Sequence, residues 1–180
     1  MKSQIGQISA TPLTAQNFAP FGTLVAIAGK QFPVNQGRGT RTNFAVESAS
    51  ADARATRQQN AIYHLDASTL PFTVTVLERH PLSAQLFLPL RAARYLVVVC
   101  EAGANGMPEM PTARAFIANS DYGIQYRAGT WHAPLIALDQ PADFLMQMWE
   151  SGTALDCEEH ALEQQVCVTA HAIALVADAD

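Results

Sequence analysis

Residues 72–80 read Phe-Thr-Val-Thr-Val-Leu-Glu-Arg-His, and this stretch decides how we expect the chain to fold. Apolar and polar side chains alternate along it, and successive side chains of a β-strand point to opposite faces. We expect one face to carry Phe72, Val74, Val76, Glu78 and His80. Because an unpaired charge at the end of an apolar face is costly to bury, the carboxylate and the imidazole need partners, a ligand or a metal ion. The pattern predicts a site inside a β-barrel.

A second histidine lies downstream, where residues 126–132 read Tyr-Arg-Ala-Gly-Thr-Trp-His. Gly129 is expected to supply the backbone freedom of a turn between two strands. We expect His132 to converge with His80 and Glu78 in one pocket. Two structural readings stay open beside this one: Glu78 and His80 as an ion pair at the rim of a barrel, and His132 bonded only to backbone. The tryptophan before His132 is expected to pack in the barrel wall.

Short strand-like runs recur along the chain, separated by Gly, Pro and Asn, without helical segments between them. This spacing predicts an all-β sandwich or barrel rather than alternating strands and helices. We expect strands at residues 22–28, 60–65, 72–80, 84–88, 94–100, 113–118, 123–127, 133–138 and 143–149. One helical turn capped by Thr14 is expected, and residues 48–57 are expected to form a short helix or a loop. The chain is expected to be one domain, residues 1–180, with a tail from about residue 170.

Composition excludes several classes of protein. The net charge is −5 without a basic cluster, so nucleic acid is not an expected partner. No apolar run approaches the ~20 residues of a membrane span, so no membrane partner is expected either. Three cysteines without a C-x-x-C pair, and an N-terminus without an apolar leader, predict a reduced cytoplasmic protein. The stretch Asp156-Cys-Glu-Glu-His160 is expected to be solvated rather than a metal cluster.

A family resemblance enters at the two histidine segments. The spacing Glu78-x-His80-x4-Gln85, followed by Gly129-x-x-His132, is similar to the two metal motifs of the cupin superfamily, with Glu and Gln at two of the usual ligand positions. The string Leu77-Glu-Arg-His-Pro-Leu82 resembles the ureidoglycolate lyase family in particular. Further matches to that family are Phe87, Arg114-Ala-Phe116, Gly123, Pro134 and Asp156-Cys-Glu158. The resemblance implies an all-β, cupin-type antiparallel jelly-roll β-barrel with few short helices, and a homodimer.

The activity that this resemblance implies is a carbon–nitrogen lyase reaction. Members of the family split ureidoglycolate into urea and glyoxylate in allantoin (purine) breakdown. The elimination needs a base for the hydroxyl proton, an acid for the departing nitrogen and a cation for the carboxylate. The implied catalytic residues are Glu78 as the base and His80 or His132 as the acid. The side chains expected to bind the small carboxylate substrate are Gln85, Tyr126, Arg127, Arg41 and His64. Of these, Arg127 is expected to reach into the pocket and clamp the carboxylate, with Arg41 as the alternative.

A divalent metal ion is another implied source of positive charge. Its expected ligands are Glu78, His80, Gln85 and His132, with Ni²⁺, Zn²⁺ and Mn²⁺ as candidates. Binding is expected to be weak, because an amide oxygen is a poor ligand beside a carboxylate. The chain departs from the family at His64, at residues 125–128, at Ala133 and at residues 148–152. Two other functions therefore stay open, namely an enzyme acting on another small hydroxy- or keto-acid and a non-catalytic ligand-binding cupin.

Overall fold

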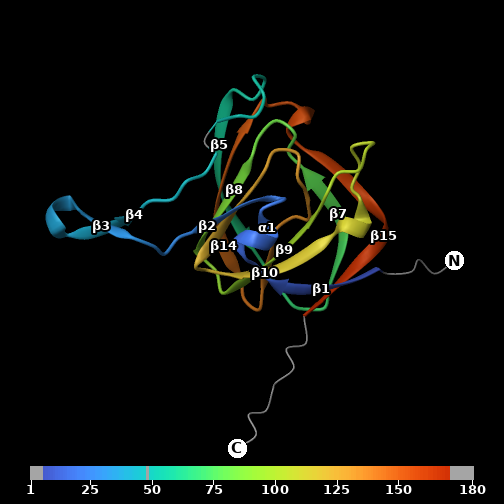
Figure 1. Ribbon diagram of the computed structural model, residues 1–180, viewed down its shortest axis with the longest axis horizontal. Coiled ribbons are helices and arrows are strands. Elements are labelled where there is room, and N and C mark those ends of the chain that lie inside the picture. Colours follow the sequence, from blue (N-terminus) through green and yellow to red (C-terminus); the bar gives the residue numbers. More distant parts are fainter. Residues whose placement is uncertain (1–5, 48, 171–180) are drawn as a thin grey trace, which may run out of the picture.

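A computed structural model describes residues 6–47 and 49–170 of the chain, and these form strands with few short helical segments (Figure 1). The strands are β1 (Gly6–Pro12), β2 (Gly22–Ala26), β3 (Gln31–Val34), β4 (Gly39–Thr42), β5 (Arg57–Leu65), β6 (Ala67–Ser68), β7 (Phe72–Arg79), β8 (Gln85–Arg91), β9 (Arg94–Cys100), β10 (Arg114–Asn119), β11 (Tyr122–Tyr126), β12 (Trp131–His132), β13 (Ile136–Leu138), β14 (Ala142–Glu150) and β15 (Glu158–Ala170). The helical segments are α1 (Ala15–Phe18) and the single turns η1 (Asn35–Gly37), η2 (Met110–Thr112) and η3 (Ala154–Asp156). The expected all-β class is confirmed.

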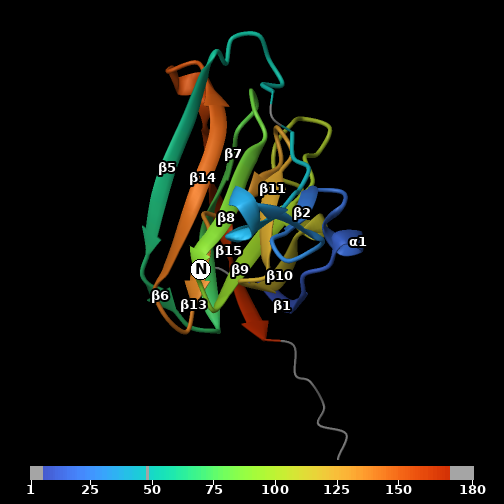
Figure 2. The ribbon, with the colours of Figure 1, turned by 90° about the vertical axis from the view of Figure 1, so that its left-hand side faces the viewer.

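Two large sheets build the body. The first has the strand order β10-β1-β15-β7-β12-β9-β13-β6, and an additional pairing of β10 with β9 closes part of it into a ring. The second has the order β2-β11-β8-β14-β5 and packs against the first (Figure 2). Most neighbouring strands are antiparallel, as expected, but β1 runs parallel to both β10 and β15, and β13 runs parallel to β6. The result is the expected barrel of cupin type.

Strand β9 is buried on both faces and separates two hydrophobic cores. Tyr95, Val97 and Val99 point into a core between the two sheets, which also contains Phe87 and Phe144. The alternate residues of β9 point into a second core, inside the ring, with Val74, Leu77 and Trp131. A strand covered on both sides needs no polar face, which explains the continuous apolar run at residues 95–100.

Strand β7 corrects one expectation. Val74 and Leu77 both lie in the second core, although strict alternation would place residues three apart on opposite faces. The pairing of β7 with β15 is irregular at this place, since Ala161 is opposite Val76 and Val166 is opposite Val74, and such an irregularity interrupts the ladder and bends the strand. The prediction that Phe72 and Val74 share a face with Glu78 and His80 is therefore wrong, because both pack in the second core with Leu77, the neighbour of Glu78. The polar end of β7 faces the space between the two sheets instead.

The hairpin β3–β4 forms a separate two-stranded sheet that no expected strand covered. It projects from the body at the end of two extended connections (Figure 1). Thr14 caps α1 as expected, since its hydroxyl accepts a hydrogen bond from Asn17 N. Residues 49–56 contain no helix, so the loop alternative holds for the part of that segment that the structure describes.

The expected tail falls, apart from Ala170, outside the described residues, and the single-domain organisation stays a prediction. In the ranges 6–47 and 49–170, no helix is long and apolar enough to cross a membrane.

Candidate active site

The two-residue strand β12 brings His132 beside Glu78. It lies between β7 and β9, with His132 opposite both Glu78 and Val99. Directly opposite residues share a face, so all three point into the space between the sheets. The Nε2 atom of His132 lies 3.5 Å from Oε1 of Glu78. The preceding turn contains Gly129 at a φ of +78°, which confirms the predicted role of this glycine.

Both histidine rings are oriented by backbone carbonyls. The Nδ1 atom of His80 lies 2.8 Å from Asp156 O, and Nδ1 of His132 lies 2.9 Å from Thr130 O. A carbonyl only accepts, so each Nδ1 carries the hydrogen and each neutral ring presents an Nε2 lone pair. The ring centroids are 5.6 Å apart, and His132 also stacks on Tyr126 at 3.9 Å with an interplanar angle of 14°. The structure thus holds two imidazoles in fixed orientations next to one carboxylate.

Buried polar atoms without a protein partner gather at this place. Among the described residues they are His80 Nε2, His132 Nε2, Gln85 Oε1 and Tyr126 OH. Leaving such an atom unsatisfied costs about 1–3 kcal/mol, so four together indicate a place built for a ligand or a metal ion. The amide of Gln85 contacts Met148 Sδ at 3.9 Å, which leaves its oxygen free. The prediction that Gln85 belongs to this cluster agrees with its position, and its role stays a prediction.

The electrostatics of the site keep Glu78 ionised and His80 neutral. Burial opposes the charge on Glu78, but the neighbouring His132, whose Nε2 lies 3.5 Å from the carboxylate, and then His80 hold the pKa of the carboxyl below its ordinary value. Burial, and then repulsion from His132, lowers the pKa of His80. Burial also raises the pKa of Tyr126 well above its ordinary value, with a further contribution from Glu78. At neutral pH the site therefore offers a carboxylate that can accept a proton and an imidazole with a free lone pair.

The same residues fit a divalent metal ion. One ligand atom each from Glu78, His80 and His132 lie within 4.8 Å of one another. Both Nε2 atoms lack a hydrogen bond, and both Nδ1 atoms are fixed by carbonyls, which is how metal-binding histidines are usually oriented. The unpartnered oxygen of Gln85 is available as a weaker fourth ligand.

Two expected substrate-binding residues are placed elsewhere. The guanidinium of Arg127 is exposed and donates to Pro20 O at 2.7 Å and to Ala19 O at 3.1 Å, so the prediction that it reaches into the pocket is wrong. The physical reason is that Arg127 follows β11 in the turn before Gly129, where two free carbonyls satisfy it. His64 is also wrong as a site residue, because its ring is 77% exposed and pairs with Asp143 on the outer surface. Arg41 lies in β4 of the projecting hairpin, outside the body.

The end of η3 and the start of β15 contribute more residues to the site than was expected. Asp156 supplies the carbonyl that orients His80, and the Cys157 thiol and a Glu159 oxygen lie within 4.8 Å of Glu78. Burial, and then the charge of Glu78, raises the pKa of the thiol to about 11, so Cys157 is a neutral wall residue at neutral pH. The acidic run in the sequence was the available signal, but only the pairing of β15 with β7 places it beside Glu78.

The opposite face of β7 is structural, and the tryptophan of β12 packs there as predicted. Arg79 pairs with Glu158 and lies over the ring of Trp131 at 4.7 Å. Trp131 is 2% exposed and donates from Nε1 to Gly106 O. These contacts hold β12 against β7 on the face opposite the candidate site, and they thereby fix the position of His132.

A cupin-type barrel with a carboxylate and two oriented histidines between its sheets is the framework of a small-molecule enzyme. The chain belongs to the ureidoglycolate lyase family, whose model matches residues 5–169.

Two relatives and one solved structure are each similar to most of this chain. The ureidoglycolate lyase of Pseudomonas fluorescens (strain SBW25) is 38% identical over 156 residues, which cover 85% of this chain and 90% of that protein. The ureidoglycolate lyase of Azotobacter vinelandii (strain DJ / ATCC BAA-1303) is 35% identical over 153 residues, 85% of this chain and 90% of that protein. Among solved structures, RmlC from Streptococcus suis in complex with dTDP-D-xylose has a TM-score of 0.49 at 8% identity and covers 84% of this chain and 75% of that one.

Proposed function

We propose that this chain splits ureidoglycolate into glyoxylate and urea at the cluster of Glu78, His80 and His132. The family membership supports the assignment of this reaction. One observation supports its assignment to this cluster of residues. All of the buried side-chain nitrogen and oxygen atoms without a hydrogen-bond partner in the described part of the chain belong to residues of this cluster or to its neighbours Gln85 and Tyr126.

The reaction moves one proton and breaks one bond. The carbinol hydroxyl loses its proton, its oxygen forms the carbonyl of glyoxylate, and the bond to the ureido nitrogen breaks as that nitrogen is protonated. Glu78 is the proton acceptor, because its lowered pKa keeps it ionised at neutral pH. His132, at 3.5 Å from the carboxylate, shares that proton and returns it to the departing nitrogen. The proton that leaves oxygen thus ends on urea, and no other reactant is needed.

A divalent metal ion held by the same residues is the alternative to this proton transfer, with Ni²⁺, Zn²⁺ and Mn²⁺ as candidates. Glu78, His80 and His132 would hold it, with Gln85 as a weak further ligand. When bound, the ion supplies Lewis-acid polarisation of the substrate hydroxyl and carboxylate. The protein's own contribution is to fix both imidazoles through Asp156 O and Thr130 O, so that their lone pairs point into the site before any ligand arrives.

We also propose that the reaction belongs to the breakdown of allantoin and takes place in the cytoplasm. The protein that carries it out is proposed to be a homodimer. All three cysteines are free thiols, which supports a reducing compartment.

The test is the stoichiometry of the products. The purified protein is incubated with ureidoglycolate, with and without each of the three metal ions, and glyoxylate, urea and ammonia are measured. We expect equal amounts of glyoxylate and urea without ammonia, which hydrolysis of the ureido group would release. Glu150→Gln is the matched control for Glu78→Gln, since Glu150 is a mostly buried carboxylate of β14 that pairs with Arg57 and does not belong to the cluster. Failure to form glyoxylate under all of these conditions would refute the proposal.

A further inference from the structure

The hairpin β3–β4 is an arm with no support from its own body. We call residues 29–42 the arm and residues 26–28 and 44–46 its stem. The two strands of the arm pair only with each other. An isolated two-stranded hairpin is marginally stable in water, and most of the arm's side chains are exposed. Such an arm is expected to be stabilised by a surface that this single chain does not provide.

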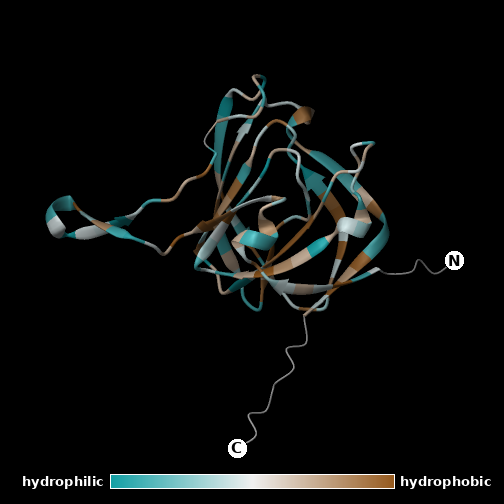
Figure 3. Cartoon of the chain, viewed as in Figure 1, coloured by the Kyte–Doolittle hydropathy of each residue, from teal (hydrophilic) through white to brown (hydrophobic). Residues whose placement is uncertain are grey.

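The apolar residues of the arm and stem are exposed as well. Phe32 of the arm is 36% exposed and Phe44 of the stem is 46% exposed. Both halves of the stem are hydrophobic, reading Ala-Ile-Ala and Phe-Ala-Val, and stand out as brown segments between the body and the hairpin (Figure 3). Large apolar side chains left open on a projecting segment indicate a contact surface.

Arg41 of the arm is a cation without a partner. In the two ranges that the structure describes, every other Lys or Arg donates to a carboxylate or carbonyl or lies over an aromatic ring. Arg41 makes none of these contacts with the described residues and is exposed. A planar guanidinium in this state is available to bind a carboxylate through two parallel hydrogen bonds.

The candidate active site lacks a cation for an anionic substrate. It contains the carboxylate of Glu78, with Glu159 beside it, and the described arginines nearest in sequence are committed elsewhere. Arg79 points to the other face of β7, and Arg127 is bound to backbone carbonyls. An anionic substrate cannot approach two carboxylates favourably without a compensating cation.

We infer that the arm of one copy of this chain covers the candidate active site of a second copy and that its Arg41 binds the substrate carboxylate there. The identity of the substrate rests on the proposed function, but the docking of the arm does not. The site is then incomplete in one chain and complete in a dimer, with each copy providing one arm and receiving the other.

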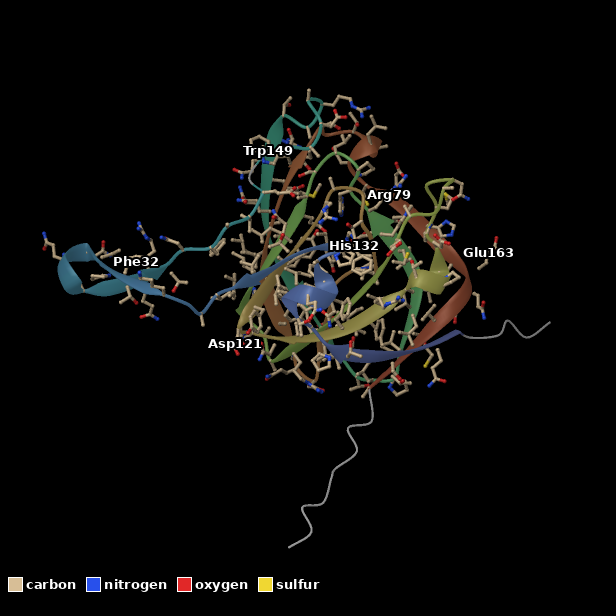
Figure 4. The ribbon with its side chains drawn as sticks, in the orientation of Figure 1. Phe32, Arg79, Asp121, His132, Trp149 and Glu163 are labelled. Atoms are coloured by element: carbon tan, nitrogen blue, oxygen red, sulfur yellow. The ribbon has the colours of Figure 1, made fainter. Side chains whose placement is uncertain are left out.

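Two observations favour a second copy over the arm's own body. The arm points away from the body, so that Phe32 lies outside the barrel that contains His132 (Figure 4). The arm also carries Lys30, Arg38 and Arg41 without an acidic residue, a charge of +3 within a chain of −5, so the remainder carries −8. A basic arm and an acidic body attract each other between copies and guide the encounter.

A cross-linking experiment tests the docking without any need for turnover. Cys157 lies beside Glu78 in the site, and an Arg41→Cys variant adds a thiol to the arm. We expect a short bismaleimide to join two chains of this variant into a covalent dimer. The matched control combines Arg41→Cys with Cys157→Ala, and we expect it to lose the dimer. A cross-link within one chain, or none that depends on Cys157, would overturn the inference.

A mixing experiment tests the role of Arg41. Arg41→Ala should raise the KM for ureidoglycolate by about 10- to 100-fold, the usual effect of losing a charged hydrogen bond. Arg38→Ala is the matched control on the same arm, because Arg38 already donates to Asn35 O, and it should change KM little. Chains carrying Arg41→Ala and chains carrying Glu78→Gln are each impaired. After mixing and subunit exchange, about a quarter of the sites should be complete, because half of the dimers are mixed and each has one intact site.

The outcomes separate this inference from the proposed function. Cross-linking without glyoxylate formation by the parent protein would refute the proposed reaction and leave the docked arm standing. Glyoxylate formation by the parent, without recovery of low-KM activity on mixing, would refute the action of Arg41 across the dimer.

Discussion

Replacing Glu78 by Gln removes one negative charge from the candidate active site and keeps the shape of the side chain. A positioned general base contributes about 10²- to 10⁴-fold to turnover, so kcat for glyoxylate formation should fall by at least about 100-fold. The change should act on kcat more than on KM, because the carboxylate is needed for proton transfer rather than for attracting an anionic substrate.

The same substitution should leave the fold intact. The pair of Glu78 and His132 spans 3.5 Å, and the Glu78 side chain is 21% exposed. Solvent screens such a pair, so its loss changes the free energy of unfolding by about 1 kcal/mol or less. Urea denaturation of the parent and of Glu78→Gln checks this value, so that a loss of rate cannot be ascribed to unfolding.

Chemical rescue distinguishes a base from a structural carboxylate. Glu78→Ala leaves space in the site, and added formate should restore part of the lost rate to this variant but not to Glu78→Gln. A Glu78→Gln protein that is folded and turns over at nearly the parent rate would refute the assignment. In that case Glu78 would be a structural partner of His132 and the proton acceptor would have to be another group.

Three further predictions concern packing, pH and the carboxylate clamp. Gly22→Ala should destabilise the protein by about 3 kcal/mol in urea denaturation, because a Cβ there would lie 2.0 Å from Gln125 O. The free energy of unfolding should fall as the pH is lowered below about 6.5, the ordinary pKa of His80, and more steeply below about 4.5, that of Glu78. Both pKa values are lowered in the fold, so the unfolded chain takes up protons first and stability is lost with acid. Arg127→Ala should leave the KM for ureidoglycolate nearly unchanged, because its guanidinium is held outside the site.

Each of these predictions has a control or a contrary result. Gly39→Ala should change stability by less than about 0.5 kcal/mol, since the nearest atom to its Cβ would be 3.7 Å away. Replacing both His80 and Glu78 by Gln should flatten the pH dependence of stability between about 4 and 7. A strong rise of KM in Arg127→Ala would return the clamp to Arg127 and remove the need for an arm from a second copy.

Local sequence patterns were sufficient to predict many of the strands. The apolar run of β9 predicted the bounds Arg94–Cys100 as observed, because a strand buried on both faces has a continuous apolar signature. Strand β15 was not predicted, since most of its residues are exposed and an irregular pairing interrupts its alternation. The hairpin β3–β4 was not predicted either, because it has no buried face to leave a pattern.

The sequence by itself determined the all-β class and singled out Glu78, His80 and His132 as candidates for the site, because strand periodicity and short-range spacing are local properties. Only the tertiary structure decided which face of β7 carries Glu78, since the alternation on which that inference relied breaks between Val74 and Leu77, where the pairing with β15 is irregular. It also decided that Arg127 is bound to loop carbonyls, that Cys157 lies in the site, and that Arg41 stands on a projecting arm. These placements depend on contacts between segments far apart in the chain, and no local pattern of residues records them.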